Sequence, residues 1–402
     1  MRKTCLILCL LLTLGSAADM DPEDSLVERN TSFALEMHRL LNKTGGNVFF
    51  SPYSISTALA MTYAGARSNT AREMSAALHF PEDQGGLHPD FQSLNSRFEG
   101  IQESGTLQLS IANALWIQAG YELLSEFTSI NHEYYEAHLY RVDFKNEPNA
   151  SRLKINGWVE DKTRGRIKDL LAPGVIKDLT RLVLTNAIHF LAKWARQFDP
   201  HDTQKLDFWV TPAKKVKVAM MSQESFFGYR EYGSHQVLEM PYQGGRLSMI
   251  VCLPKRVDGL EELEQQLNIS TIQEWTSRHP SRQIKVFFPK FTSTGEYSLR
   301  DYLMALGMKE AFTDKADFSG IEPKKELKID AVIHKTFIDV DEAGTEAAAA
   351  TAVVMAVQAA LPGPELPEFR ADHPFLYFIC DNQTGTILFM GRMVEPENSS
   401  DS

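Results

Sequence analysis

Apolar residues in the first part of the chain recur at helical spacing. Over 26–43 they return every three or four positions, and Gly45-Gly46 ends the pattern. Ser51-Pro52 opens a second helix, because proline is favoured in the first helical turn. The same spacing predicts further helices over 69–78, 90–103 and 150–171.

Short apolar runs bounded by Gly, Pro or Asn predict strands later in the chain, from about residue 182 onward. These runs are 182–184, 216–220, 247–253, 284–288, 328–340, 375–379 and 387–389. Helices therefore come first and strands dominate the rest. This order predicts one mixed α+β domain rather than regular βαβ alternation.

Residues 1–18 form a pattern separate from the fold. Arg2 and Lys3 are followed by an apolar run, Cys5 to Leu14, and then by small residues ending at Ala18. This is the pattern of a secretory signal peptide, so we expect cleavage after Ala18, a mature domain over 19–402 and a secreted, extracellular protein. A buried N-terminal helix is the alternative. The run is too short to cross a bilayer, and no later segment is long and apolar enough to do so.

The chain is acidic, with a formal net charge of −11 that becomes more negative once Arg2 and Lys3 leave. Such a chain is a poor partner for nucleic acids or anionic membranes, so we expect neither. The short basic cluster of Lys214, Lys215 and Lys217 is interpreted as a solvated strand edge. No basic helix indicates glycosaminoglycan binding.

Two of the four cysteines, Cys5 and Cys9, leave with the signal peptide. Cys252 and Cys380 each lie inside an apolar run and show no metal-ligand or redox spacing. In a secreted protein they could pair, and the alternative, which we favour, is two buried free thiols.

Six asparagines begin the sequence pattern for N-linked glycosylation. They are Asn30, Asn42, Asn149, Asn268, Asn382 and Asn398. Together with the signal peptide they predict a glycoprotein on the secretory route.

Enzyme motifs are missing from the sequence. It contains no Walker loop, HExxH pair, nucleophile elbow or dinucleotide fingerprint, and its eleven histidines lack ligand spacing. We therefore expect no enzyme, no metal site and no cofactor, and an inhibitor or a carrier becomes the more plausible function.

The segment from Asp341 to Pro374 has an unusual composition. Between Gly344 and Leu361 it has no proline, and its only charge is Glu346. The alanines of 347–352 favour a helix, whereas the valines that follow favour a strand. As a strand, the segment would present one charge-free face from Thr345 to Met355 with every N–H free for pairing, up to the prolines beyond Leu361.

Residues 342–351, EAGTEAAAAT, resemble the hinge of inhibitory serpins. Further motifs are similar to those of the same family and lie in family order from about residue 26 to 396. They are NVFFSPYSI (47–55), NAIHF (186–190) with Lys193-Trp194 and Phe198, QVLEMP (236–241), PKF (289–291), ADFSGI (316–321), VIHK (332–335) and HPF (373–375).

The resemblance implies a serpin fold, with three β-sheets, about nine helices and an exposed reactive-centre loop at about 342–369. In this family a serine protease attacks the loop as a substrate and forms an acyl-enzyme. The loop then inserts into the central sheet, and the protease is trapped as a covalent complex. We accordingly expect a monomeric inhibitor whose partner is a serine protease.

The resemblance also assigns roles to residues of this chain. The hinge comprises Glu342, Gly344, Thr345, Glu346, Ala347, Ala348, Ala349 and Ala350. The polar cluster beneath the opening sheet, the shutter, comprises Ser51, Ser54, Asn186 and His334. Trp194 marks the breach, where insertion begins.

Counting along the loop as in the family places the scissile bond between Gln358 and Ala359, or alternatively between Val357 and Gln358. No Lys or Arg lies between Glu342 and Phe369, so trypsin-like proteases lack the basic residue that their pocket needs. Elastase-like targets are expected first, and chymotrypsin-like ones second. The alternatives are a non-inhibitory serpin acting as carrier or storage protein, and a substrate-like inhibitor that never inserts.

Overall fold

The computed structural model describes residues 22–103, 107–345 and 366–397. The predicted signal peptide, most of the hinge, both candidate scissile bonds and Asn398 lie outside these residues. The predictions for them therefore stay predictions.

Nine α-helices form within the described residues. They are α1 (Pro22–Leu41), α2 (Pro52–Tyr63), α3 (Ser68–Leu78), α4 (Leu87–Glu103), α5 (Ser125–Tyr135), α6 (Pro148–Lys162), α7 (Leu260–Gln265), α8 (Ile269–Thr276) and α9 (Arg300–Ala305). Short 3-10 turns lie at Asn42–Thr44, Pro200–Asp202 and Glu310–Phe312. None of the helices in the described part of the chain combines the length and the apolar character needed to span a membrane.

Fifteen strands form in the same described residues. They are β1 (Val48–Phe50), β2 (Leu107–Gln118), β3 (His138–Val142), β4 (Leu182–Lys193), β5 (Gln204–Thr211), β6 (Lys214–Glu231), β7 (His235–Pro241), β8 (Leu247–Pro254), β9 (Ser281–Pro289), β10 (Phe291–Ser298), β11 (Ala331–Val340), β12 (Gly344–Thr345), β13 (Glu368–Arg370), β14 (Phe375–Asp381) and β15 (Ile387–Met393).

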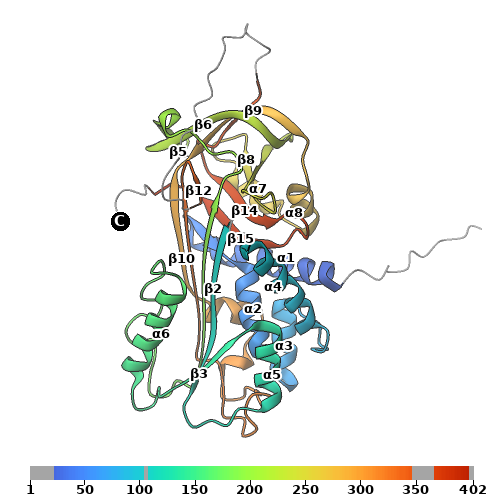
Figure 1. Ribbon diagram of the computed structural model, residues 1–402, viewed down its shortest axis with the longest axis vertical. Helices are drawn as coiled ribbons and strands as arrows, with labels where there is room; N and C mark the ends of the chain where they lie inside the picture. The colour runs from blue at the N-terminus through green and yellow to red at the C-terminus, as the bar shows by residue number, and fades with distance from the viewer. Residues whose placement is uncertain (1–21, 104–106, 346–365, 398–402) are drawn as a thin grey trace, which may run out of the picture.

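A six-stranded sheet runs along the length of the molecule in the order β10-β11-β12-β4-β2-β3 (Figure 1). The α6 helix covers one face, and α2 to α5 cover the other (Figure 1). Alternation along β2 accounts for both layers, since successive side chains point to opposite faces. Ala112, Ala114 and Trp116 pack beneath α6, while Leu115 and Ile117 join the main core.

The other nine strands form a network that the long strand β6 divides into two sheets. Strand β6 pairs with β5 and β9 up to Gly228, and with β7 over its last four residues. One sheet therefore holds β5, β6, β9 and β13, and the other holds β7, β8, β14, β15 and β1. With the six-stranded sheet this makes three sheets, so the predicted α+β architecture is confirmed.

Cys252 and Cys380 are free thiols, and both are buried. The antiparallel register of β8 and β14 places Cys252 opposite Leu376 and Cys380 opposite Ser248. Four residues of strand, about 13 Å, separate the two positions along the sheet, which is beyond the reach of a disulfide. The prediction of two buried free thiols is confirmed, and burial raises the pKa of both.

The described sequon asparagines differ in exposure. Asn30 lies in α1 with only 3% of its surface exposed. A bulky glycan there would have to displace the side chains around it, and glycosylation at Asn30 stays a prediction. Asn149 and Asn268 are exposed, whereas Asn42 and Asn382 are half-buried. Glycosylation at these four stays a prediction.

Candidate functional site

The four predicted shutter residues lie together beneath the junction of β4 and β11. These two strands pair in parallel, with His334 directly opposite Asn186. Ser51 and Ser54 reach the same place from the start of α2, where the Ser51 hydroxyl caps the helix by accepting from the Ser54 N–H at 3.2 Å. All four side chains are completely buried.

Hydrogen bonds link these groups across the strand junction. The Ser51 N–H donates to Nε2 of His334 at 3.1 Å, so the neutral imidazole carries its proton on Nδ1 and donates it to the Asn186 side-chain oxygen. The Asn186 amide donates to the Ser54 carbonyl at 2.9 Å and to the side-chain oxygen of Asn113. A strand entering between β4 and β11 would break the link between Asn186 and His334.

Burial lowers the pKa of His334 from 6.5 to about 3. Below pH 6.5 the unfolded chain takes up a proton at this position and the folded chain does not, so stability is lost as the pH falls. We expect wild type to lose about 2 kcal/mol more unfolding free energy between pH 7.5 and pH 5 than His334→Gln, which has no group to protonate. Urea unfolding at the two pH values measures this.

The remaining histidines are common to both proteins, so their titration cancels in this comparison. Parallel pH dependences for wild type and His334→Gln would show that His334 does not couple protonation to the fold.

Trp194 lies where the hinge enters the six-stranded sheet. Its ring stacks on Tyr242, with centroids 4.7 Å apart, and its Nε1 donates to the carbonyl of Asp341 at 2.9 Å. The Tyr242 hydroxyl in turn forms a 2.8 Å hydrogen bond with Thr345. Trp194 and Tyr242 therefore form a buried platform beneath the start of the loop.

The hinge residues Gly344 and Thr345 already form the two-residue strand β12. Thr345 pairs with Val340 of β11 on one side and with Ala192 of β4 on the other. A Cβ on Gly344 would lie 2.1 Å from the Ala192 carbonyl oxygen, so only glycine fits this close approach.

Glu342 anchors the chain just before this strand. Its carboxylate accepts hydrogen bonds from Lys290 and Thr203, each at 2.7 Å. Although burial alone would raise the pKa of Glu342, these two bonds hold it below its usual value. The neighbouring Asp341 accepts from the N–H groups of Ala343 and Gly344, while burial raises its pKa.

The structure thus brings the shutter residues into one cluster and places Trp194, Glu342, Gly344 and Thr345 in another, at the entry to the sheet. Glu346, Ala347 to Ala350, Val357, Gln358 and Ala359 lie outside the described residues. Sequence reasoning assigned no role to Asn113, Tyr242, Thr203 or Lys290. Only Lys290 carried a signal, as part of the PKF motif.

Comparison with known proteins gives one consistent result. Residues 28–396 match the model of the family described as Serpin (serine protease inhibitor). The chain is 44% identical over 376 residues to an uncharacterized serpin-like protein of Thermococcus kodakarensis, covering 94% of this chain and 87% of the relative. It is 40% identical over 384 residues to leukocyte elastase inhibitor A of Rattus norvegicus, covering 93% and 100%.

Solved structures agree with these relatives. Uncleaved ovalbumin is 32% identical and superposes with a TM-score of 0.83, covering 92% of this chain and all of that chain. Serpin48 of the insect Tenebrio molitor is also 32% identical, with a TM-score of 0.82 over 95% of this chain. The chain therefore belongs to the serpin family of serine protease inhibitors.

Proposed function

We propose that this chain is a secreted glycoprotein inhibitor that traps an elastase-like serine protease by inserting its cleaved loop into the six-stranded sheet. One observation carries the proposal. Gly344 and Thr345 form a strand between β4 and β11, so the sheet has an entry point that the residues after Thr345 can extend. About 13 further residues at about 3.3 Å each would reach roughly 43 Å along the sheet.

Each step follows from the residues of the loop. The protease serine attacks the carbonyl carbon of Gln358, and the bond to Ala359 breaks, leaving the loop joined to the protease as an ester. The freed segment then extends β12, and no charged side chain on its inward face, Thr345 to Met355, opposes burial. Rapid insertion would deform the protease before water can hydrolyse the ester.

Loop composition supports the choice of target. Ala, Val and Met surround the expected bond, and the loop offers no basic residue to an acidic pocket. The relative named leukocyte elastase inhibitor A points to the same class of protease. The secretory route rests on the signal-peptide pattern of residues 1–18 and on the sequons.

Incubation with a pancreatic or leukocyte elastase, followed by denaturing electrophoresis, tests the mechanism. We expect a covalent complex that survives denaturation. Cleavage without a complex would mean a substrate-like loop, and an unchanged chain would favour a non-inhibitory serpin such as a carrier.

The position of the scissile bond is a separate prediction. Mass spectrometry of the peptide released from the complex should find a new N-terminus at Ala359, or at Gln358 if the loop count shifts by one. The rate of trypsin inhibition should then be at least about 100-fold higher for Gln358→Arg than for wild type, because the arginine side chain pairs with the acidic pocket of trypsin and glutamine does not. Release of a peptide that begins after Arg370 would contradict both the loop count and the elastase assignment.

A further inference from the structure

Asn268 is an exposed sequon asparagine that lies directly before α8. Its side-chain oxygen caps the helix by accepting from the Thr271 N–H at 3.0 Å. Its side-chain nitrogen donates to the Gln266 carbonyl at 2.9 Å. An amide nitrogen carries two hydrogens, and an N-linked sugar replaces one of them. Glycosylation at Asn268 therefore leaves the helix cap intact, because the cap uses the oxygen.

The half-buried sequon residue Asn382 uses its amide differently. Its nitrogen donates to the Gly245 carbonyl at 3.0 Å and to the Ser248 hydroxyl at 2.8 Å. Both hydrogens are engaged, so a sugar on Asn382 would remove one of these two bonds. At Asn268 the hydrogen that remains after glycosylation is enough for the single bond to Gln266. The hydrogen bonds thus favour a glycan at Asn268 over one at Asn382.

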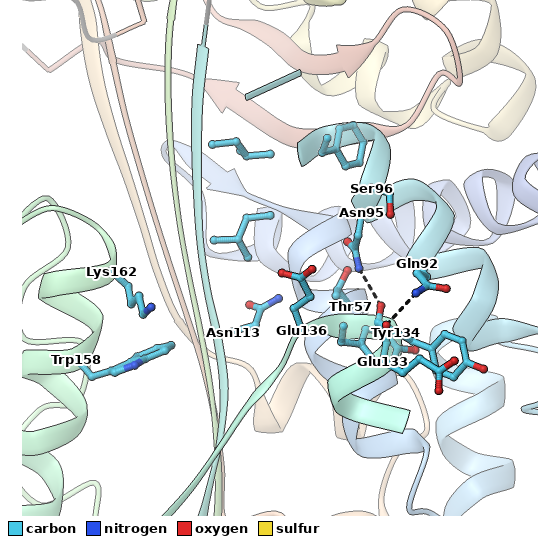
Figure 2. Close-up of a pocket in the computed structure, with 14 residues that line it drawn as sticks. Thr57, Gln92, Asn95, Ser96, Asn113, Glu133, Tyr134, Glu136, Trp158 and Lys162 are labelled. Atoms are coloured by element: carbon cyan, nitrogen blue, oxygen red, sulfur yellow. Dashed lines mark hydrogen bonds between the residues drawn. The ribbon is translucent and has the colours of Figure 1, made fainter. Parts of the chain in front are cut away.

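A groove of about 410 Å³ lies between α1 and the start of α8, and Asn268 belongs to its lining. This volume falls within the range for small-molecule sites. The other two residues of the sequon, Ile269 and Ser270, line the same groove. By contrast, no sequon residue among those that the structure describes lines the pocket between β2 and the helices α4 and α5 (Figure 2). A sugar attached to Asn268 therefore starts at the edge of the α1–α8 groove.

The lining of the groove has the mixed character that suits a neutral sugar. Two apolar side chains, Leu35 and Ile269, lie among the polar side chains of Ser32, Glu36, Arg39 and His79. Sugar hydroxyls both donate and accept, so they can bond a carboxylate and a guanidinium alike. A charged ligand would meet a group of its own sign, Glu36 or Arg39, whereas a neutral sugar meets none.

Hydrogen bonds between α1 and the α8 region hold the groove in place. Arg39 of α1 donates to the Leu267 carbonyl at 3.0 Å, and Gln273 of α8 donates to the Glu28 carboxylate at 3.1 Å. These two contacts lie on either side of Asn268 in the sequence. The walls are therefore fixed before a sugar binds, and little ordering is lost on binding.

We propose that Asn268 carries an N-linked glycan whose first sugars pack into the groove between α1 and α8 and stabilise the contact between these helices. Because the sugars are attached to a residue of the groove, their effective concentration there is high and weak contacts suffice to dock them. The proposal rests on the secretory route of the proposed function, since glycans of this kind are added on that route.

Secretion of the full-length protein from cultured mammalian cells, followed by mass-spectrometric mapping of the glycans, tests the modification. We expect a glycan on Asn268 in most molecules and none on Asn382. A bare Asn268 in a protein that is glycosylated at Asn149 would overturn the proposal and leave the secretory route intact. A protein retained in the cells without any glycan would overturn both.

Thermal unfolding tests the packing of the sugars in the groove. Ser270→Ala removes the sequon without changing Asn268, while Ser270→Thr keeps the sequon and serves as the matched control. In secreted protein, Ser270→Ala should unfold at least about 2 °C below wild type, and Ser270→Thr should match wild type.

The same three proteins, made as residues 19–402 in the bacterial cytoplasm, lack the glycan and should unfold at one temperature. An equal loss for Ser270→Ala in both hosts would assign the effect to the serine side chain. No loss in either host would mean that the glycan projects into solvent. Either result would overturn the packing of the sugars in the groove.

Discussion

Cleavage of the loop should raise the thermal unfolding temperature of this protein by at least about 10 °C. Insertion would add a strand of about 13 residues to the middle of the six-stranded sheet, at a net gain of about 1 kcal/mol for each hydrogen bond. In a chain of this length each kcal/mol corresponds to about 1–2 °C. Calorimetry of intact and cleaved protein, cut by a protease that is not trapped, measures the difference.

The variant Ala349→Pro provides the control for this result. Proline has no N–H and is excluded from the interior of a central strand, so it should stop insertion a few residues beyond Thr345. The cleaved variant should keep the unfolding temperature of the intact form within a few degrees. An equal rise in wild type and variant would mean that cleavage stabilises the fold without strand insertion.

Helix and strand positions followed from local patterns where burial and periodicity agreed. In the predicted helix over 150–171, the second part is buried at helical spacing but does not form a helix. The structure ends α6 at Lys162, because Gly165 has φ 78° and the chain turns there. Ile167, Leu170 and Leu171 are nevertheless buried in the core beneath α6. Their spacing reflects packing against the sheet, which a loop can also satisfy.

The candidate site depended on contacts that no local pattern contains. Ser51 and His334 are 283 residues apart in the chain yet joined by a hydrogen bond. The family motifs located these residues, whereas composition and periodicity placed them only in a helix start and a strand. Asn113 and Tyr242 carried no motif, and their roles follow only from the three-dimensional register of β2 with β4 and from the stacking on Trp194.

Replacing Thr345 by arginine should turn the inhibitor into a substrate. Thr345 is completely buried, and its hydroxyl forms a hydrogen bond with the hydroxyl of Tyr242. An arginine there would either bury an unpaired guanidinium, at a cost of about 3–5 kcal/mol, or leave the sheet and remove the entry point. Either outcome slows insertion, so hydrolysis of the acyl-enzyme overtakes trapping. The yield of covalent complex with elastase should fall at least about tenfold, while the rate of loop cleavage stays unchanged.

The intact variant should already differ from wild type, because Thr345 is docked before any protease acts. If residue 345 leaves the sheet in Thr345→Arg, the Tyr242 hydroxyl loses its hydrogen-bond partner and the stacked ring of Trp194 becomes more exposed to water. The tryptophan fluorescence of the uncleaved protein should therefore change. Thr345→Ser keeps the hydroxyl and the small volume, so it should match wild type in both fluorescence and complex yield. If Thr345→Arg formed as much covalent complex as Thr345→Ser, the start of insertion would have to lie beyond Thr345. The strand β12 would then be a fixed feature of the sheet rather than its entry point.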